Sequence, residues 1–422
     1  MKVVMGNYFG LLMNKRRTFD LVPRVAFFTT VIVLLLTVLP ACSDNSAQIQ
    51  SAVTNYYVGN YPQAEAIMAP LAQHPDEDYV LNNCRYGSSA LAAGDLQRAQ
   101  QAFLVAYQLM NSSNVNSNGR AFATVVFYEG IKVWLGEPFE RAMAQYYLGL
   151  TYLIQNDYDN ARAAFENSLF ALRKYSDLDD KNIPAGQQYD KIESNFVLGY
   201  FGLGVCYLEL GEKDLANANF QHAEQLDLSI EPLVRRMLEP QTNTLIFVDY
   251  GFGPQRRAEG WYGEQSVFGP APWQAGPIPP AYVWDNDRYL NVVAPGMVDT
   301  LALAQDKRWL TMDTVRETKA IVGTGLMAGG AGAALYGANH NNGTVALAGL
   351  GAILAGAALA ASSQADVRYW EMLPRTVYAI PVALEPGDNS FQVVVGNRST
   401  ARININIVPN GKLNVFYFRL PQ

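Results

Sequence analysis

The chain has 422 residues, with 31 Lys and Arg against 38 Asp and Glu, so its net charge is −7. It has no basic excess to condense onto phosphates, and we therefore predict no nucleic-acid partner. Half of the residues are hydrophobic and only 16% are charged, which excludes a disordered chain and provides apolar material for at least two packed cores. The three cysteines and three histidines are not in CxxC or HExxH spacing, so we predict no metal site and no disulfide framework.

Residues 1–41 have the order of an export signal. A basic cluster that ends at Arg24 precedes an apolar run over 25–39, and the run leads into a Leu-Pro-Ala-Cys motif at 39–42. This order resembles a bacterial lipoprotein signal peptide, in which the cysteine is acylated and becomes the new N-terminus. The resemblance implies lipidation at Cys42, and Ser43 after it implies the periplasmic face of the outer membrane. An ordinary secretory signal or a plain transmembrane anchor is the alternative.

A helical-hairpin pattern recurs four times over residues 42–240. In each copy a turn residue precedes a signature alanine by five positions, in the pairs 59/64, 94/99, 156/161 and 211/216. The segment from Tyr200 to Ala223 has the spacing of large, small and aromatic residues found in a tetratricopeptide (TPR) repeat. Small residues such as Gly204 let paired helices approach closely, and aromatic residues such as Phe220 fill the space between pairs. We therefore predict a TPR-like α-solenoid.

Such a solenoid has a concave groove, lined mainly by the first helix of each pair. By resemblance to TPR proteins, the protein-binding groove positions are Tyr146, Leu150, Phe201 and Val205. Apolar and aromatic side chains at these positions suit a partner peptide or helix. The alternative is that they contact the chain's own C-terminal half, and the sequence does not decide between the two.

The pattern changes to β-type after residue 240. Residues 241–313 combine a strand-like run at Leu245–Gly251 with many Gly, Pro and Trp, which predicts a mixed β and loop region with a short helix. Residues 371–422 predict a small antiparallel β module, in which Arg402–Ile407 alternates and Pro409–Lys412 turns a final hairpin. These strands could also complete a sheet begun at Leu245. The fold class that follows is multi-domain α+β.

The segment 314–370 is predicted to form a Gly/Ala-rich helical hairpin with uncharged arms over 321–337 and 345–361. Small residues recur every four positions and would form a helix-packing zipper. They are Gly325, Gly329, Ala333, Gly337, Ala348, Ala352, Gly356 and Ala360. Each arm would span about 25 Å at about 1.5 Å per residue, barely short of the hydrocarbon thickness. Two interpretations stay open: a bilayer-embedded hairpin or zipper oligomer, and a helical pair packed on its own protein.

Most of the chain resembles bacterial TPR lipoproteins of the cell envelope, through a Gly-Glu-Pro-Phe-Glu-Arg run at 136–141 and an Ala-Asp-x-Arg-Tyr-Trp-Glu run at 365–371. The resemblance carries no activity, cofactor or catalytic residue. No nucleophile elbow, Ser/His/Asp order or metal spacing stands out, so we predict a protein that is not an enzyme.

We expect a lipid-anchored envelope scaffold or adaptor that gathers other envelope proteins through its TPR repeats. The alternative is a membrane-active or secretion-associated component that oligomerises through the zipper of the 321–361 hairpin. The sequence leaves homo-oligomerisation open.

Overall fold

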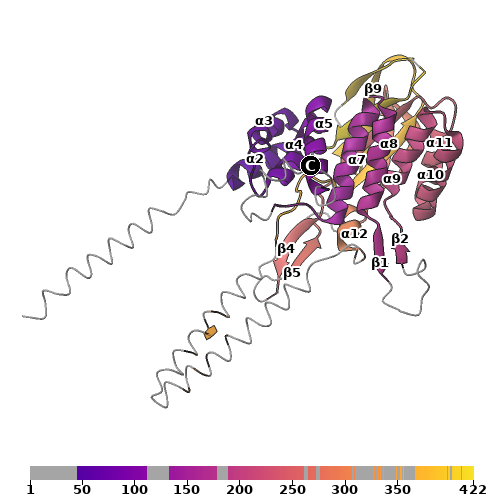
Figure 1. The fold of residues 1–422 in the computed structure, drawn as a ribbon. Helices are drawn as coiled ribbons and strands as arrows, with labels where there is room; N and C mark the ends of the chain where they lie inside the picture. The colour runs from indigo at the N-terminus through magenta and orange to yellow at the C-terminus, as the bar shows by residue number, and fades with distance from the viewer. Residues whose placement is uncertain are drawn as a thin grey trace, which may run out of the picture. The chain divides into compact units, whose positions relative to one another are not determined.

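The computed structural model divides the chain into two units, residues 1–47 and 48–422. The structure describes residues 45–111, 133–177, 189–260, 265–271, 276–306, 308, 366–396, 398–399, 402–409 and 411–422, together with single helical positions between 327 and 355. The predicted signal and Cys42 lie outside the described residues. Helices and strands of the second unit are labelled in Figure 1.

Helical hairpins form the N-terminal half of this unit (Figure 1). The pairs are α2 (Ser46–Tyr57) with α3 (Tyr61–Leu71), α4 (Tyr79–Ala93) with α5 (Leu96–Met110), α7 (Pro138–Ile154) with α8 (Tyr158–Ala171), and α9 (Val197–Glu209) with α10 (Lys213–Leu226). Successive pairs pack against each other through α3 on α4, α5 on α7 and α8 on α9, and α11 (Glu231–Met237) follows the last pair. An unpredicted two-stranded ribbon, β1 (Lys174–Asp177) and β2 (Tyr189–Ile192), joins α8 to α9.

The turns inside the hairpins confirm the predicted repeat. All four turn residues have a left-handed backbone, with φ between 59° and 87°. Glycine adopts this conformation without strain, and asparagine is among the few other residues that tolerate it, which explains why Asn156 can stand where the other three copies have glycine. The signature alanines that follow are completely buried; they are Ala64, Ala99, Ala161 and Ala216.

Close approach of the paired helices explains the small residues of the repeat. A Cβ added at Gly204 would lie 2.6 Å from the Phe220 ring, and one at Gly149 would lie 2.9 Å from the Phe165 ring. These separations are too short for a real contact, so the aromatic side chain of the second helix fits only because the first helix has no side chain at that point.

Three small sheets form the C-terminal half. One has the order β12-β3-β8, from β3 (Thr244–Tyr250), β8 (Thr376–Val382) and β12 (Asn414–Arg419). A five-stranded sheet has the order β10-β9-β6-β7, with β11 also paired to β9. Its strands are β6 (Ala281–Asp285), β7 (Arg288–Ala294), β9 (Gly387–Val395), β10 (Arg398–Ser399) and β11 (Ile403–Ile407). β4 (Gln255–Glu259) and β5 (Gln265–Gly269) form a separate pair, and α12 (Thr300–Gln305) is the short helix.

The three-stranded sheet belongs to two hydrophobic cores, because neighbouring side chains of a strand point to opposite faces. Leu245 and Phe247 of β3 join the core that contains the helical stack. Ile246 and Val248 join the core that contains the inner side chains of the five-stranded sheet, such as Val283. The three-stranded sheet is therefore the layer between the helices and the five-stranded sheet.

The strand pairing corrects one prediction and settles another. The hairpin that was predicted to turn at Pro409–Lys412 is wrong, because β11 pairs with β9 while β12 pairs with β3 in a parallel arrangement. β3 is buried on both faces and has β8 at one edge and β12 at the other. The chain therefore passes from the five-stranded sheet to the three-stranded sheet between β11 and β12. The other prediction, that the last strands complete the sheet begun at Leu245, describes the arrangement found.

Candidate functional site

The four predicted groove residues lie inside the molecule. Tyr146, Leu150, Phe201 and Val205 are all completely buried, with 0% of their surface exposed. The Tyr146 ring lies 6.3 Å from that of Phe247 in β3, measured between centroids, so the C-terminal half covers this position. The expectation that these side chains are presented to a partner does not hold in this structure, because the three-stranded sheet shares a core with the stack.

Residues 366–373, which we call the docked segment, also lie against the stack. Trp370 is almost completely buried, and its ring lies 6.0 Å from Phe103 and 5.8 Å from Tyr147 between centroids. Its indole N–H donates a hydrogen bond to Ser88 Oγ over 3.2 Å, and its backbone N–H donates to Glu140 Oε1 over 2.8 Å. Helices α4, α5 and α7 therefore hold one indole and its backbone between them.

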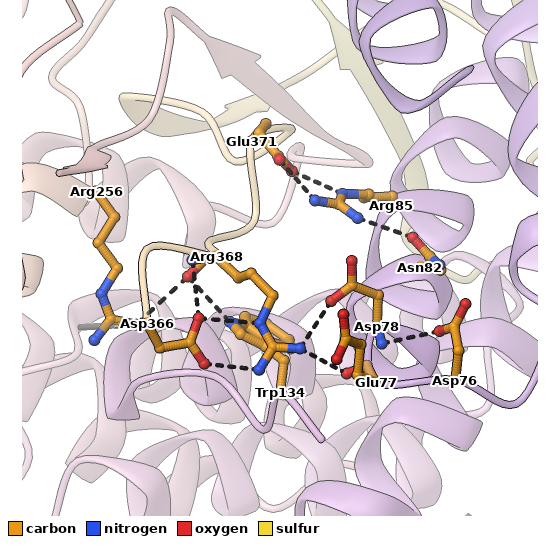
Figure 2. Close-up of polar contacts among 10 residues, drawn as sticks. All are labelled: Asp76, Glu77, Asp78, Asn82, Arg85, Trp134, Arg256, Asp366, Arg368 and Glu371. Carbon is orange, nitrogen blue, oxygen red and sulfur yellow. Dashed lines mark hydrogen bonds and ion pairs between the residues drawn. The ribbon is translucent and has the colours of Figure 1, made fainter. Parts of the chain in front are cut away.

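An ion pair holds the docked segment beside Trp370. Arg85 in α4 donates from Nε to one carboxylate oxygen of Glu371 over 2.7 Å and from Nη2 to the other over 2.6 Å (Figure 2). Asn82 accepts a third hydrogen bond from Arg85 Nη1 over 2.8 Å. This two-pronged geometry matches the planar guanidinium to the carboxylate, and it is among the stronger polar contacts in proteins.

The other end of the docked segment is held through Arg368. Figure 2 shows its guanidinium between Asp366 and Asp78, at 2.7 and 2.9 Å. The Arg368 backbone carbonyl accepts hydrogen bonds from the Trp134 indole over 3.3 Å and from Arg256 over 3.4 Å. Contacts from the stack and from β4 therefore fix both the side chain and the backbone at this position.

Glu140 is the buried acid of this region. Burial raises the pKa of its carboxyl to about 7. The carboxylate accepts hydrogen bonds from the backbone N–H groups of Glu137 and Trp370, and these two bonds lower the pKa. The docked segment thus depends on a carboxyl that titrates near neutral pH.

A second buried polar network joins the stack to the three-stranded sheet. Asp249 in β3 accepts hydrogen bonds from the hydroxyls of Tyr147 over 2.6 Å and Tyr417 over 2.8 Å. Burial raises the pKa of Asp249 to about 6, while Arg419 lowers it. The Arg419 guanidinium lies over the Tyr57 ring, 5.2 Å from its centroid. This network, like the docked segment, fastens the C-terminal half to the helices.

Among the described residues, one exposed surface is the outward side of the five-stranded sheet, which we call the outer sheet face. Tyr282 and Trp284 of β6 are each 39% exposed, and Val293 of β7 is 48% exposed. The Tyr289 ring lies 5.4 Å from Trp284 and 6.3 Å from Tyr282 between centroids. Further outward residues are Asp388, Ser390, Gln392 and Val394 of β9 and Asn404 and Asn406 of β11.

Sequence reasoning missed the outer sheet face and the role of the docked segment. The alternation at 281–285 and 403–407 was the available signal for the face, since every second residue there is buried in the structure. The aromatic and charged run at 368–371 was noted only as part of a resemblance. Nothing in its local pattern indicates that it packs against helices more than two hundred residues earlier in the chain.

Cys42 and most of the predicted zipper lie outside the described residues. Of the predicted zipper, only Ala333, Ala348 and Ala352 are described, each as a single helical position. In the part of the chain that the structure describes, no helix combines the length and the apolar character that a membrane span needs. Within the same part, no three His, Cys, Asp or Glu side chains are grouped so that they could hold a metal ion.

The matches of this chain to known proteins are among solved structures. No protein-family model matches the chain, and no curated protein matches it either. Among solved structures, the crystal structure of MamA is 18% identical, and the match covers 51% of this chain and 97% of that chain with a TM-score of 0.29. That TM-score is too low to carry an argument about function. The observed helical hairpins make the N-terminal half a TPR-like region, a type of domain consistent with protein–protein interaction.

Proposed function

We propose that the protein is a lipid-anchored scaffold of the cell envelope and not an enzyme. In this proposal the TPR-like stack holds the C-terminal half in place, and the outer sheet face receives the binding partner. This differs from the sequence-based expectation in one respect, which is that the partner does not bind through the groove positions of the repeats.

One observation carries the proposal: the chain fills its own groove and leaves the outer sheet face open. A groove-bound partner would have to displace the docked segment, in which Trp370 is buried and Glu371 is paired with Arg85. Displacement would break both hydrogen bonds of that pair, in which the Arg85 side chain is only 4% exposed, and would expose the Trp370 ring to water. The rings of Tyr282 and Trp284 need no displacement, because they are already partly exposed.

The envelope location is supported by the Leu-Pro-Ala-Cys motif at 39–42 alone. Acyl chains contribute about 0.8 kcal/mol for each buried methylene, so two or three chains on Cys42 would keep the protein on a bilayer. The scaffold would then gather other envelope components at the membrane surface, most directly at the periplasmic face of the outer membrane.

Site-specific photo-crosslinking in cells tests this proposal. A photoreactive residue at Val293, on the outer sheet face, should give a crosslinked adduct. The same residue at Leu228, which is 78% exposed beyond the end of α10, is the matched control and should give none. An adduct from Leu228 and none from Val293 would refute the assignment of the face.

Fatty-acid labelling tests the anchor separately. Labelling of the parent protein and its loss in Cys42→Ser, together with release of that variant from membranes, is the expected result. Equal labelling of the two proteins, or recovery of the parent protein in the cytosol, would refute the anchor.

A further inference from the structure

We propose that β11 is a self-association edge, at which a second copy of this chain adds its own β11 as the next strand of the sheet. The inference goes beyond the proposed function, because it depends neither on the lipid anchor nor on the partner of the outer sheet face. Three features carry it: an edge that lacks the usual protection against strand pairing, a strand sequence that reads the same in both directions, and an exposed apolar side chain directly beyond the strand.

In the described part of the chain, β11 and β7 are the two edges of the five-stranded sheet. Phe391 of β9 has a partner on each side, Asp285 of β6 and Ile403 of β11, so β6 and β11 flank β9. In an antiparallel ladder alternate residues direct their N–H and C=O groups away from the partner strand, and an edge strand presents these groups to another chain. Among the described residues, no loop and no side chain forms a hydrogen bond with the backbone of residues 403–407.

The two edges differ in how they are protected. At β7, Asn291 has a left-handed backbone with φ of 54°, and its carbonyl accepts a hydrogen bond from Arg236 over 3.4 Å. Such an irregularity interrupts the straight edge that an added strand needs. Residues 403–407 contain no Lys, Pro, Gly or acidic residue, and none of them has a positive φ. Apart from its shortness, β11 therefore lacks the features by which edge strands avoid pairing.

The sequence of β11 selects a second copy as the occupant. Residues 403–407 read Ile-Asn-Ile-Asn-Ile in either direction. Antiparallel pairing of two copies about Ile405 therefore places Ile403 opposite Ile407 of the second copy, and Asn404 opposite its Asn406. Residues directly opposite each other lie on the same face of a sheet, so isoleucines meet on the core side and asparagines meet on the outer side. Each contact occurs twice, as a twofold interface requires.

The residues beyond the strand favour the same register. Pro409 has no N–H for a ladder, and pairing about Ile405 leaves it outside the five paired residues. Val408, which is 49% exposed, would lie opposite Arg402 of the second copy. The Arg402 side chain is 59% exposed and can lay its methylene groups on Val408 while its guanidinium keeps Asp287 as partner. This register therefore covers an apolar side chain that the single chain leaves exposed.

The side chains on both faces of the contact are compatible. The inward isoleucines of β11 belong to the core of the sheet or pack against it, and those of the second copy would continue that core. Asn406 already donates a hydrogen bond to Asp388 over 2.7 Å, so its amide oxygen would accept from Asn404 of the second copy. The strand itself is uncharged, so the net charge of −7 is not concentrated at the contact. Because the contact is smaller than the about 1,200–2,000 Å² of standard interfaces, we expect a weak, reversible dimer.

Disulfide trapping of the purified full chain in a mild detergent tests the contact and its register. Two variants, Asn404→Cys and Asn406→Cys, carry different affinity tags and are mixed before oxidation. Opposite positions of an antiparallel pair have Cα atoms about 4.5–5.5 Å apart, so the mixture should give a linked dimer that carries both tags. Each variant alone should give at least fivefold less dimer. Two copies of one position would be about 8 Å apart, at about 3.4 Å per residue along the strand and about 4.8 Å between strands.

The matched control for trapping is Val293→Cys, an exposed position on the opposite edge strand β7. It should give no more dimer than the parent protein, whose own thiols set the background. Circular dichroism should show each variant folded. Absence of a mixed dimer above the background, or equal trapping by Asn404→Cys alone, would overturn the proposal.

Sedimentation velocity at several concentrations tests the dimer without added cysteines. The parent protein should show a monomer–dimer equilibrium with a Kd between about 1 μM and about 100 μM. The double variant Asn404→Lys/Asn406→Lys places like charges opposite each other and should weaken the dimer at least tenfold. The proposal fails if the parent protein stays monomeric at about 200 μM. It also fails if the Lys variant dimerises as tightly as the parent protein, because self-association would then belong to another surface, such as the predicted zipper.

Discussion

Replacing Trp370 with alanine should strongly destabilise the protein, because this side chain is the largest of the apolar side chains that the docked segment buries against the helices. Loss of a buried aromatic side chain costs about 3–5 kcal/mol when the cavity cannot collapse. The indole also donates a hydrogen bond to the buried Ser88 hydroxyl, whose loss adds about 1 kcal/mol. We therefore expect the free energy of unfolding to fall by about 4–6 kcal/mol, a large part of a typical total of about 5–15 kcal/mol.

Urea unfolding of the full chain, followed by circular dichroism, measures this change. Trp370→Phe should lose only about 1–2 kcal/mol, since it keeps most of the ring and loses the indole donor. Trp284→Ala is the matched control: its ring is 39% exposed on the outer sheet face, so its truncation removes less buried apolar surface and should destabilise the protein clearly less than Trp370→Ala. If Trp370→Ala is no more destabilising than Trp284→Ala, the docked segment does not fasten the two halves together.

Three further predictions follow from the burial of single groups. Because burial raises the pKa of Glu140 from its usual 4.5 to about 7, the folded protein holds this proton more tightly than the unfolded chain, and the free energy of unfolding should fall as the pH rises from 4.5 to 7. Urea titrations at several pH values should show that Glu140→Gln reduces this dependence of the free energy of unfolding on pH. An unchanged dependence would mean that groups other than Glu140 cause it. Gly204→Ala should lower the melting temperature, because its Cβ would meet the Phe220 ring at 2.6 Å, and a melting temperature equal to the parent's would show that this contact yields. Asn156→Gly should be neutral or slightly stabilising and Asn156→Ala destabilising by about 1 kcal/mol, because φ is 59° at this turn; equal stability of the two variants would contradict that reasoning.

The repeat was predictable from sequence because its determinants are local. Each turn residue and its signature alanine are five positions apart, and the left-handed turns at Gly94 and Asn156 follow from residue type. The small residue at Gly204 and the aromatic at Phe220 come from consecutive helices of one hairpin, so their pairing also follows from short spacing. The strand positions could be predicted for the same reason, since the period-2 alternation at 403–407 is visible in the sequence alone.

Tertiary structure alone decided how these elements are used. The sequence marked Tyr146 as a groove residue but could not show that Phe247, a hundred residues later, would cover it. In the same way the pairing of β12 with β3 instead of β11, and the packing of Trp370 between Phe103 and Tyr147, depend on contacts between distant segments. Burial of apolar surface drives these contacts and is not directional, so a local pattern shows which side chains seek a partner but not which distant surface supplies it.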